Sequence, residues 1–209
     1  MKRKHLALAL LAIVLVMFGC TAATQAERDL RAQLLLLKNV NQPALSILYN
    51  SIEHSEYDEF LESYGLSSDQ AIRMVAAYLK RFDYSIISSE ESGDSAIVRA
   101  KITMMDFGDL VYRCSEALIS SEFSAVLRGD ASAIAETIDS VLQSGAVSSQ
   151  TIECDVHMRR NDGKTFTIAV DEEFINAFSG GGIEYLRSCG LGEYADMAVS
   201  MAKSLFKQP

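Results

Sequence analysis

The stretch TIECDVHMRRNDGKTFTIAV, residues 151–170, decides the fold because its pattern is that of a β-hairpin. Apolar and polar residues alternate on both sides of Asn161-Asp162-Gly163, and an Asp-Gly step between two such runs is a strong turn signal. One face of the first strand carries Ile152, Cys154, Val156 and Met158, and the other carries Thr151, Glu153, Asp155, His157 and Arg159. An antiparallel sheet accepts one apolar and one polar face. The stretch therefore predicts two antiparallel strands with a core on one side and solvent on the other.

A second hairpin is predicted upstream. Tyr84, Ile86 and Ser88 alternate with Ser85 and Ile87, and the chain then turns at Ser92-Gly93-Asp94. The returning strand alternates again, with one face made of Ala96, Val98, Ala100, Ile102 and Met104. Two hairpins predict a sheet of about four strands.

Helical spacing of apolar residues fills most of the remaining chain. It predicts helices at 27–38, 43–54 and 57–64, and another from the capping residues 67–69 to Phe82. Residues 109–127 and 131–144 predict two helices between the hairpins, each followed by a glycine suited to end a helix. After the second hairpin, 172–179 and two pieces within 183–207 are helical. The pattern predicts the α+β class.

Two of these helices carry apolar stripes that need a partner. In 27–38, Leu30, Leu34 and Leu37 form the stripe, and Leu35 and Leu36 widen it. We expect this helix to pack on the domain; a helix lying on a membrane is the alternative, but its polar face is not basic. In the last helix we expect a packing face made of Tyr194, Met197, Ala198, Met201 and Leu205.

Residues 1–19 have the layout of a signal peptide. Lys2, Arg3 and Lys4 precede an apolar run from Leu6 to Phe18 that is too short to span a bilayer. The Gly19-Cys20 junction resembles the lipobox of bacterial lipoproteins, in which the cysteine is acylated and becomes the mature N-terminus. Cys20 is therefore the expected lipidation site. The alternative is an ordinary secretory signal cut nearby, with Cys20 a plain thiol or an uncleaved anchor.

The signal-peptide and lipobox patterns predict that the protein lies on the extracytoplasmic side of the cell membrane, held by lipidated Cys20. Residues 20–26 are the expected tether and 27–209 a single α+β domain. The 209 residues carry a net charge of −9; without residues 1–19 there are 16 basic and 28 acidic residues, a net charge of −12. An acidic protein repels phosphate backbones, so we expect no nucleic-acid partner.

The three further cysteines, Cys114, Cys154 and Cys189, are an odd number and show no short C-x-x-C spacing. Cys114 and Cys154 fall on apolar faces, where a thiol behaves as a small hydrophobic group. We expect free thiols rather than a disulfide, and no metal site or cofactor.

Several segments together resemble small lipoproteins of Gram-positive bacteria. These are Phe82–Ile86, Gly93–Val98, Ile102–Asp106 and the Asn-Asp-Gly-Lys turn at Asn161–Lys164, within residues 67–178. The resemblance implies a nuclear-transport-factor-two-like or cystatin-like domain. Its expected form is an α+β fold with a curved antiparallel sheet of about four strands, in two hairpins, packed against several helices. It supplies no catalytic residues.

Enzyme activity is the alternative to a binding function. Cone-shaped relatives of that fold include isomerases and dehydratases with an acid or base in the sheet, and Asp155 and His157 share one strand face here. That face is opposite the apolar one, so solvent exposure is the simpler interpretation. We expect a non-enzymatic lipoprotein that binds a small apolar ligand between sheet and helices, or an envelope protein. A scaffold or sensor acting through an exposed surface is a third hypothesis.

Overall fold

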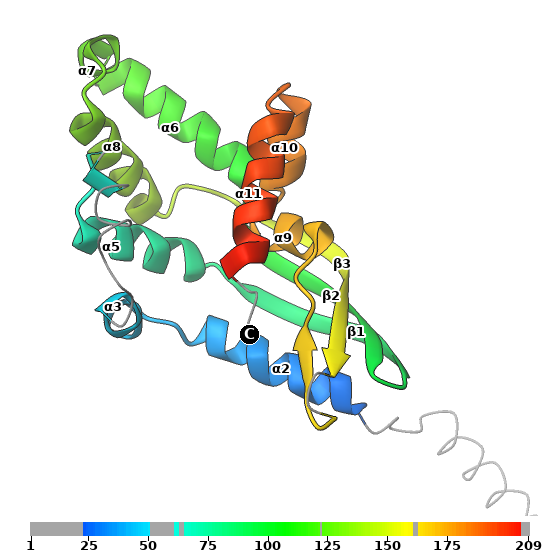
Figure 1. The fold of residues 1–209 in the computed structure, drawn as a ribbon. Coiled ribbons are helices and arrows are strands. Elements are labelled where there is room, and N and C mark those ends of the chain that lie inside the picture. The colour runs from blue at the N-terminus through cyan, green and yellow to red at the C-terminus, as the bar shows by residue number, and fades with distance from the viewer. Residues whose placement is uncertain (1–22, 51–60, 63–64, 122, 161–162, 206–209) are drawn as a thin grey trace, which may run out of the picture.

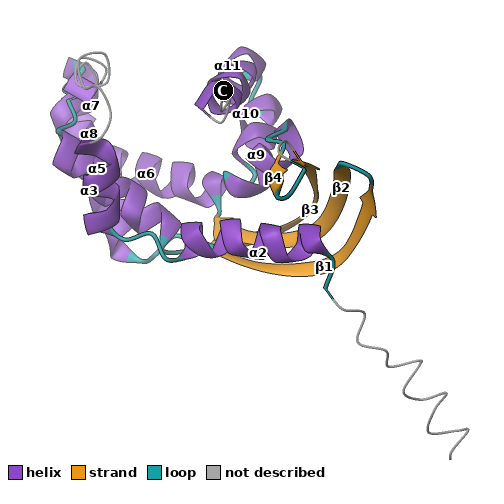
Figure 2. Cartoon of the chain, turned by 60° about the horizontal axis from the view of Figure 1, so that its bottom comes forward, coloured by secondary structure: helices purple, strands orange, loops and turns teal. Residues whose placement is uncertain are grey.

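The computed structural model describes residues 23–50, 61–62, 65–121, 123–160 and 163–205 (Figure 1). The predicted signal peptide with Cys20, most of the helix expected at 57–64, and residues 206–207 lie outside this part. The fold is α+β, as predicted, with one antiparallel sheet in the order β1-β2-β3-β4. Its strands are β1 (Asp83–Ser92), β2 (Ser95–Met105), β3 (Ser149–Arg160) and β4 (Phe166–Ile168). Figure 2 shows that the sheet is curved.

The helices fall into three groups along the chain. Before the sheet come α2 (Gln25–Lys38), α3 (Gln42–Asn50) and α5 (Ser68–Leu79); between β2 and β3 come α6 (Phe107–Ser121), α7 (Phe123–Arg128) and α8 (Ala131–Ser144); after β4 come α9 (Glu172–Phe178), α10 (Gly182–Ser188) and α11 (Gly192–Leu205). The two predicted hairpins are joined by direct pairing of β2 with β3, so the middle helices form an insert at one end of the sheet (Figure 1).

The main core lies on one face of β2 and β3. The inward residues are those that the alternation predicts, including Val98 and Ile102 on β2 and Val156 on β3, all fully buried. Leu30 and Leu34 of α2 and Phe174 and Ala177 of α9 pack against them. Because burial of apolar surface drives folding, the position of this face fixes where α2 and α9 lie.

Strand β1 departs from the simple alternation that the sequence predicts. The register with β2 shifts between Ile86 and Ser88, so Ile87 forms a bulge and is 48% exposed. Beyond the bulge the side chains on the α2 side of β1 are polar: Ser89 is half-buried and Glu91 is exposed. The bulge therefore turns polar side chains toward the start of α2.

Helix α2 also covers the open edge of β4. The Asp29 Oδ2 atom accepts the N–H of Phe166 at 2.9 Å, and the Gln33 Nε2 atom donates to the Phe166 carbonyl at 2.8 Å. The N–H of Ile168 donates to Gln33 Oε1 at 3.3 Å. An uncovered strand edge is an aggregation hazard. Two side chains of α2 thus occupy the backbone groups that a fifth strand would use.

Two smaller cores hold α5, α6, α8, α10 and α11. Met105, Leu142 and Val147 pack with residues of α5, α6 and α8, and Ile183, Ala195 and Val199 join α10 to α11. The segment that follows α9 is hydrogen-bonded to the first residue of α6: the Phe107 N–H donates to the Gly180 carbonyl at 3.0 Å. The insert and the C-terminal helices are therefore both fixed at the end of β2.

Three predictions about the helices were wrong in part: two concern packing faces and one concerns a helix boundary. Of the predicted leucines on α2, Leu30 and Leu34 are fully buried and Leu37 is partly buried against the core, whereas Leu35 and Leu36 are exposed. On α11, Tyr194 and Met197 point to solvent, whereas Ala195 and Val199 form the packed face. The predicted helix 109–127 is two helices, α6 and α7.

The expected tether 20–26 extends too far. Thr24 caps α2 by accepting the N–H of Glu27 at 3.1 Å, and Ala26 is fully buried. Residues 24–26 are therefore part of the folded domain, which begins earlier than residue 27.

Candidate functional site

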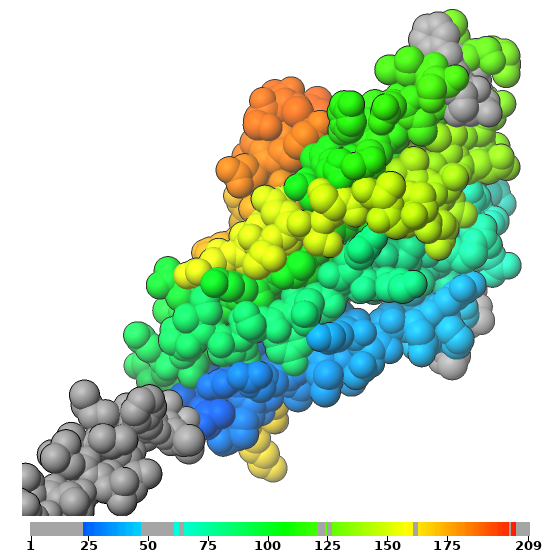
Figure 3. Space-filling view, turned by 180° about the vertical axis from the view of Figure 1, so that it is seen from behind, coloured from blue at the N-terminus to red at the C-terminus, as the bar shows by residue number. Residues whose placement is uncertain are grey.

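The outer face of the sheet carries a ladder of charged and polar side chains on β2 and β3. Figure 3 shows the strands as adjacent bands on this side of the molecule. Arg99 on β2 lies opposite Asp155 on β3, and its Nε is 3.5 Å from Asp155 Oδ1 and 3.0 Å from Glu153 Oε1. All three side chains are exposed, so water screens these ion pairs and each contributes little to stability.

His157 lies two residues beyond Asp155 on β3, on the same face, and has a different partner. Its Nδ1 is 3.7 Å from Oδ2 of Asp171, the residue before α9. The other oxygen of that carboxylate accepts the N–H of Phe174 at 2.9 Å, so Asp171 also caps α9. Capping holds the carboxylate in place beside the imidazole.

Asp155 and His157 are thus on the same face, as predicted, but each is bound to another group. Asp155 pairs with Arg99 through its side chain, and its backbone N–H donates to Glu173 Oε1 at 2.9 Å. The acid nearest the imidazole is Asp171, which the sequence reasoning did not select. The signal available was its position as a cap before the predicted helix 172–179.

A surface cleft of about 340 Å³ surrounds this pair. Its walls include Ser95 and Ile97 of β2, His157 and Arg159 of β3, and Asp171. An imidazole beside a carboxylate can accept and donate a proton, and Arg159 adds a positive charge. The cleft therefore has the groups for acid–base chemistry or for holding a small polar molecule.

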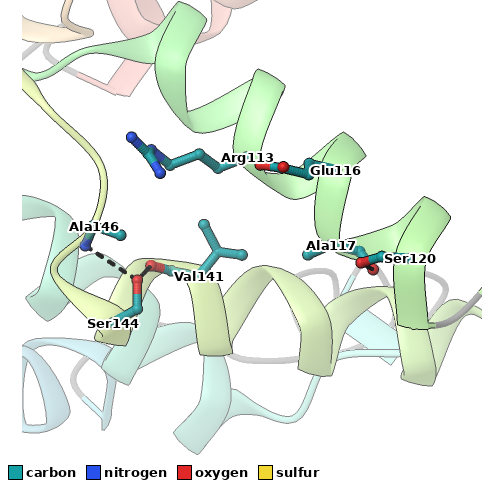
Figure 4. Close-up of a pocket in the computed structure, with 7 residues that line it drawn as sticks. All are labelled: Arg113, Glu116, Ala117, Ser120, Val141, Ser144 and Ala146. Atoms are coloured by element: carbon teal, nitrogen blue, oxygen red, sulfur yellow. Dashed lines mark hydrogen bonds between the residues drawn. The ribbon is translucent and has the colours of Figure 1, made fainter.

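A second pocket lies between α6 and α8 and measures about 330 Å³ (Figure 4). Arg113, Glu116, Ala117 and Ser120 line it from α6, and Val141, Ser144 and Ala146 line it from α8 and the segment after it. Arg113 extends toward that segment in Figure 4, and its Nε is 3.0 Å from Asp109 Oδ1. Because the guanidinium is already paired, the pocket offers a partly neutralised cation to a ligand.

The carboxylate of Asp109 ties this pocket to the sheet. Its Oδ2 accepts the backbone N–H of Ser148 at 2.6 Å, just before β3 begins. The hydrogen bonds from Ser148, followed by that from Arg113, hold the pKa of Asp109 below its usual value. Asp109 has a structural role in joining α6 to β3.

Exposed apolar side chains gather on α11. Tyr194 and Met197 are 58% and 56% exposed, and Leu191 precedes them at the same spacing of three. Tyr and Met are enriched at the centres of protein interfaces. We call Leu191, Tyr194 and Met197 the α11 stripe.

The three described cysteines are free thiols in different environments. Cys154 is buried, Cys114 is half-buried and Cys189 is exposed. Burial, reinforced by the carboxylate of Glu173, raises the pKa of Cys154 to about 12. Among the described residues no group of three or more His, Cys, Asp or Glu side chains could hold a metal ion.

No family model matches the chain, and no curated protein matches it. A search of solved structures found similarity to the crystal structure of a candidate lipoprotein, ycdA, from Bacillus subtilis. That match covers 76% of this chain at 15% sequence identity, with a TM-score of 0.49. This chain covers 56% of the other one, little more than half of its length. None of these comparisons supports the nuclear-transport-factor-two-like or cystatin-like shape, which stays an expectation from the sequence.

Within residues 23–50 and the later described ranges, no helix is both long and apolar enough to cross a membrane. Cys20, the predicted lipidation site, lies outside those ranges.

Proposed function

We propose that the protein is a lipoprotein, anchored by acylated Cys20 on the extracytoplasmic side of the membrane, that binds an envelope protein. The observation that favours a protein partner is the α11 stripe. Its Tyr194 and Met197 project from a helix whose opposite side is already packed through Ala195 and Val199. An exposed apolar stripe next to polar residues is typical of a binding surface.

A small apolar ligand between the sheet and its helices is less favoured. Leu30 and Leu34 of α2 are fully buried against the inward face of β2 and β3, so side chains already fill that layer. The two pockets described above lie elsewhere, on the outer face and between α6 and α8.

Anchoring is tested by replacing the proposed lipid acceptor. Cys20→Ala should move the protein out of the membrane fraction or block its processing. Cys189→Ala is the matched control, because it removes an exposed thiol elsewhere and should leave the protein in the membrane. Unchanged mass and membrane retention of the Cys20→Ala protein would contradict the lipid anchor.

Partner binding is tested by photocrosslinking in intact cells, with a photoreactive amino acid in place of Tyr194 or, as a control, of Leu36. Leu36 is an apolar residue that is 71% exposed on α2, and it is not part of the α11 stripe. A discrete protein adduct from position 194 that is missing from position 36 is expected. Equal labelling at the two positions would argue against a partner at α11.

The alternative is an enzyme that uses His157, and the pairing with Asp171 is the observation that favours it. His157→Ala combined with Asp155→Asn should leave folding and the position-194 adduct intact if the protein acts by binding. Loss of a measured turnover with the fold intact would favour the enzyme instead. A scaffold or sensor acting through an exposed surface is the third hypothesis, and it too would use the α11 stripe.

A further inference from the structure

One end of the sheet collects the start of α2, the β1–β2 turn and the outer end of the β3–β4 hairpin (Figure 1). Thr24 Oγ1 lies 2.8 Å from Ser89 Oγ, and the N–H of Ala26 donates to Glu91 Oε1 at 2.6 Å. Gln25 hydrogen-bonds to the carbonyl of Lys164. We call residues 89–95, 159–160 and 163–164, with the first turn of α2, the tip. Helix α7 lies at the opposite end of the molecule (Figures 1 and 2).

The covalent distance from Cys20 to the tip is short. Three residue steps separate Cys20 from Ala23, and each spans at most about 3.6 Å. Whatever conformation residues 21 and 22 adopt, Cys20 is within about 11 Å of the start of the folded domain. Acyl chains on Cys20 would therefore hold the tip against the headgroups.

We propose that the tip rests on the phospholipid headgroup layer, so that the insert α6–α8 projects away from the membrane. The proposal depends on the lipid anchor proposed above. The occupant of the tip surface is the bilayer because the chain that leads to Cys20 departs from this surface.

The chemistry of the tip fits headgroups rather than the hydrocarbon interior. Its turn residues Ser92, Gly93, Asp94 and Ser95 are small or polar and exposed. Arg159 and Lys164 supply positive charge, while Glu90 and Asp94 supply negative charge. A surface of both signs matches zwitterionic headgroups and gives no strong attraction to anionic lipid. The short link, not net charge, sets the orientation.

The orientation leaves the proposed binding surface free. Helix α11 lies away from the tip in Figure 1, so the α11 stripe stays accessible to another envelope protein. The insert, at the far end, is the part that reaches furthest from the bilayer.

The test is photocrosslinking of the full chain in its own membrane. A photoreactive amino acid replaces Ser92 at the tip or, as the matched control, Arg128 at the end of α7; both positions are exposed. Phospholipid adducts are measured by mass spectrometry, and membrane retention is measured on the same cells. Adducts from position 92 and none from position 128 are expected. Retained protein with equal adducts at both positions, or with none at position 92, overturns the orientation while the anchor stands.

A second variant tests the cause. About 20 Gly and Ser residues inserted between positions 22 and 23 lengthen the link to roughly 25 Å on average. The adduct from position 92 should then be lost while the protein stays in the membrane. An undiminished adduct overturns the proposal, because the short link would not be what holds the tip. A protein absent from the membrane fraction overturns both the anchor and the orientation.

Discussion

At the residue scale, Cys154 and Cys189 are the same group in opposite environments. Burial and nearby carboxylates raise the pKa of Cys154 to about 12, whereas Cys189 is exposed. Because the thiolate is the reactive form, Cys189 should react with a maleimide in the folded protein at pH 7 and Cys154 should not. Mass mapping of the labelled chain checks this. Labelling of Cys154 before unfolding would mean that the core opens there.

Gly180 is a position where the packed backbone leaves no room for a Cβ atom. Its φ is +55°, and a Cβ there would lie 1.9 Å from the Met105 carbonyl oxygen. Gly190 has a φ of +76° and no heavy atom within 4 Å of a Cβ. Gly190→Ala should therefore lower the free energy of unfolding by only the left-handed strain, about 1–2 kcal/mol. Gly180→Ala should lower it by more, because the backbone of β2 must also move.

Urea unfolding of Gly180→Ala and Gly190→Ala separates the cost of left-handed backbone strain, which both variants carry, from the cost of the contact with Met105, which only Gly180→Ala carries. Equal losses of stability would show that the end of β2 yields without cost, contrary to the packing at Met105.

At the element scale, α2 is oriented by Leu30 and by Leu34, the one fully buried member of the run of four leucines at 34–37. Leu34 is fully buried and Leu36 is 71% exposed on the same helix. Leu34→Ala should lower the free energy of unfolding by about 2–5 kcal/mol, through lost burial and a cavity. Leu36→Ala should change it by about 0.5 kcal/mol or less. Chemical denaturation of the pair checks this, and similar losses would place a second face of α2 against the domain.

The sequence predicts the strands better than the helix faces, for a physical reason. Alternation in β2 leaves one choice of inward face, and the structure uses it. The run Leu34–Leu37 offers several helix faces, and contacts distant in sequence with β2 and β4 choose among them. The same holds on α11, where the small Ala195 packs closely and the larger Tyr194 stays outside.

The candidate site was half predictable. Strand periodicity places His157 and Asp155 on one face, and the structure confirms that placement. The pairing of His157 with Asp171 depends on where α9 begins after β4, a tertiary relation that no local pattern encodes. The bulge at Ile87 was likewise invisible, since Ile86-Ile87 fits either inward or outward pairing.

At the scale of the whole molecule, two carboxylates join one element to another, α6 to β3 and α9 to α10. Asp109 of α6 accepts the N–H of Ser148 before β3, and Glu172 of α9 pairs with Arg187 of α10. The hydrogen bonds from Ser148 and from Arg187, respectively, lower the pKa of each carboxyl from its ordinary value of 3.8 or 4.5. Both contacts thus favour the ionised form in the folded state.

These shifts predict acid sensitivity with a definite sign. As pH falls below about 4.5, the unfolded chain takes up protons before the folded one, so the stabilisation present above that pH is lost as pH falls through the folded pKa values. The melting temperature should therefore drop between pH 5 and pH 3, and Asp109→Asn with Glu172→Gln should make that drop shallower. Glu136→Gln, which removes an exposed carboxylate of α8, is the control. If the double variant and the control follow the wild-type slope, these two contacts do not link folding to pH, and the joints at α6–β3 and α9–α10 rest on apolar packing instead.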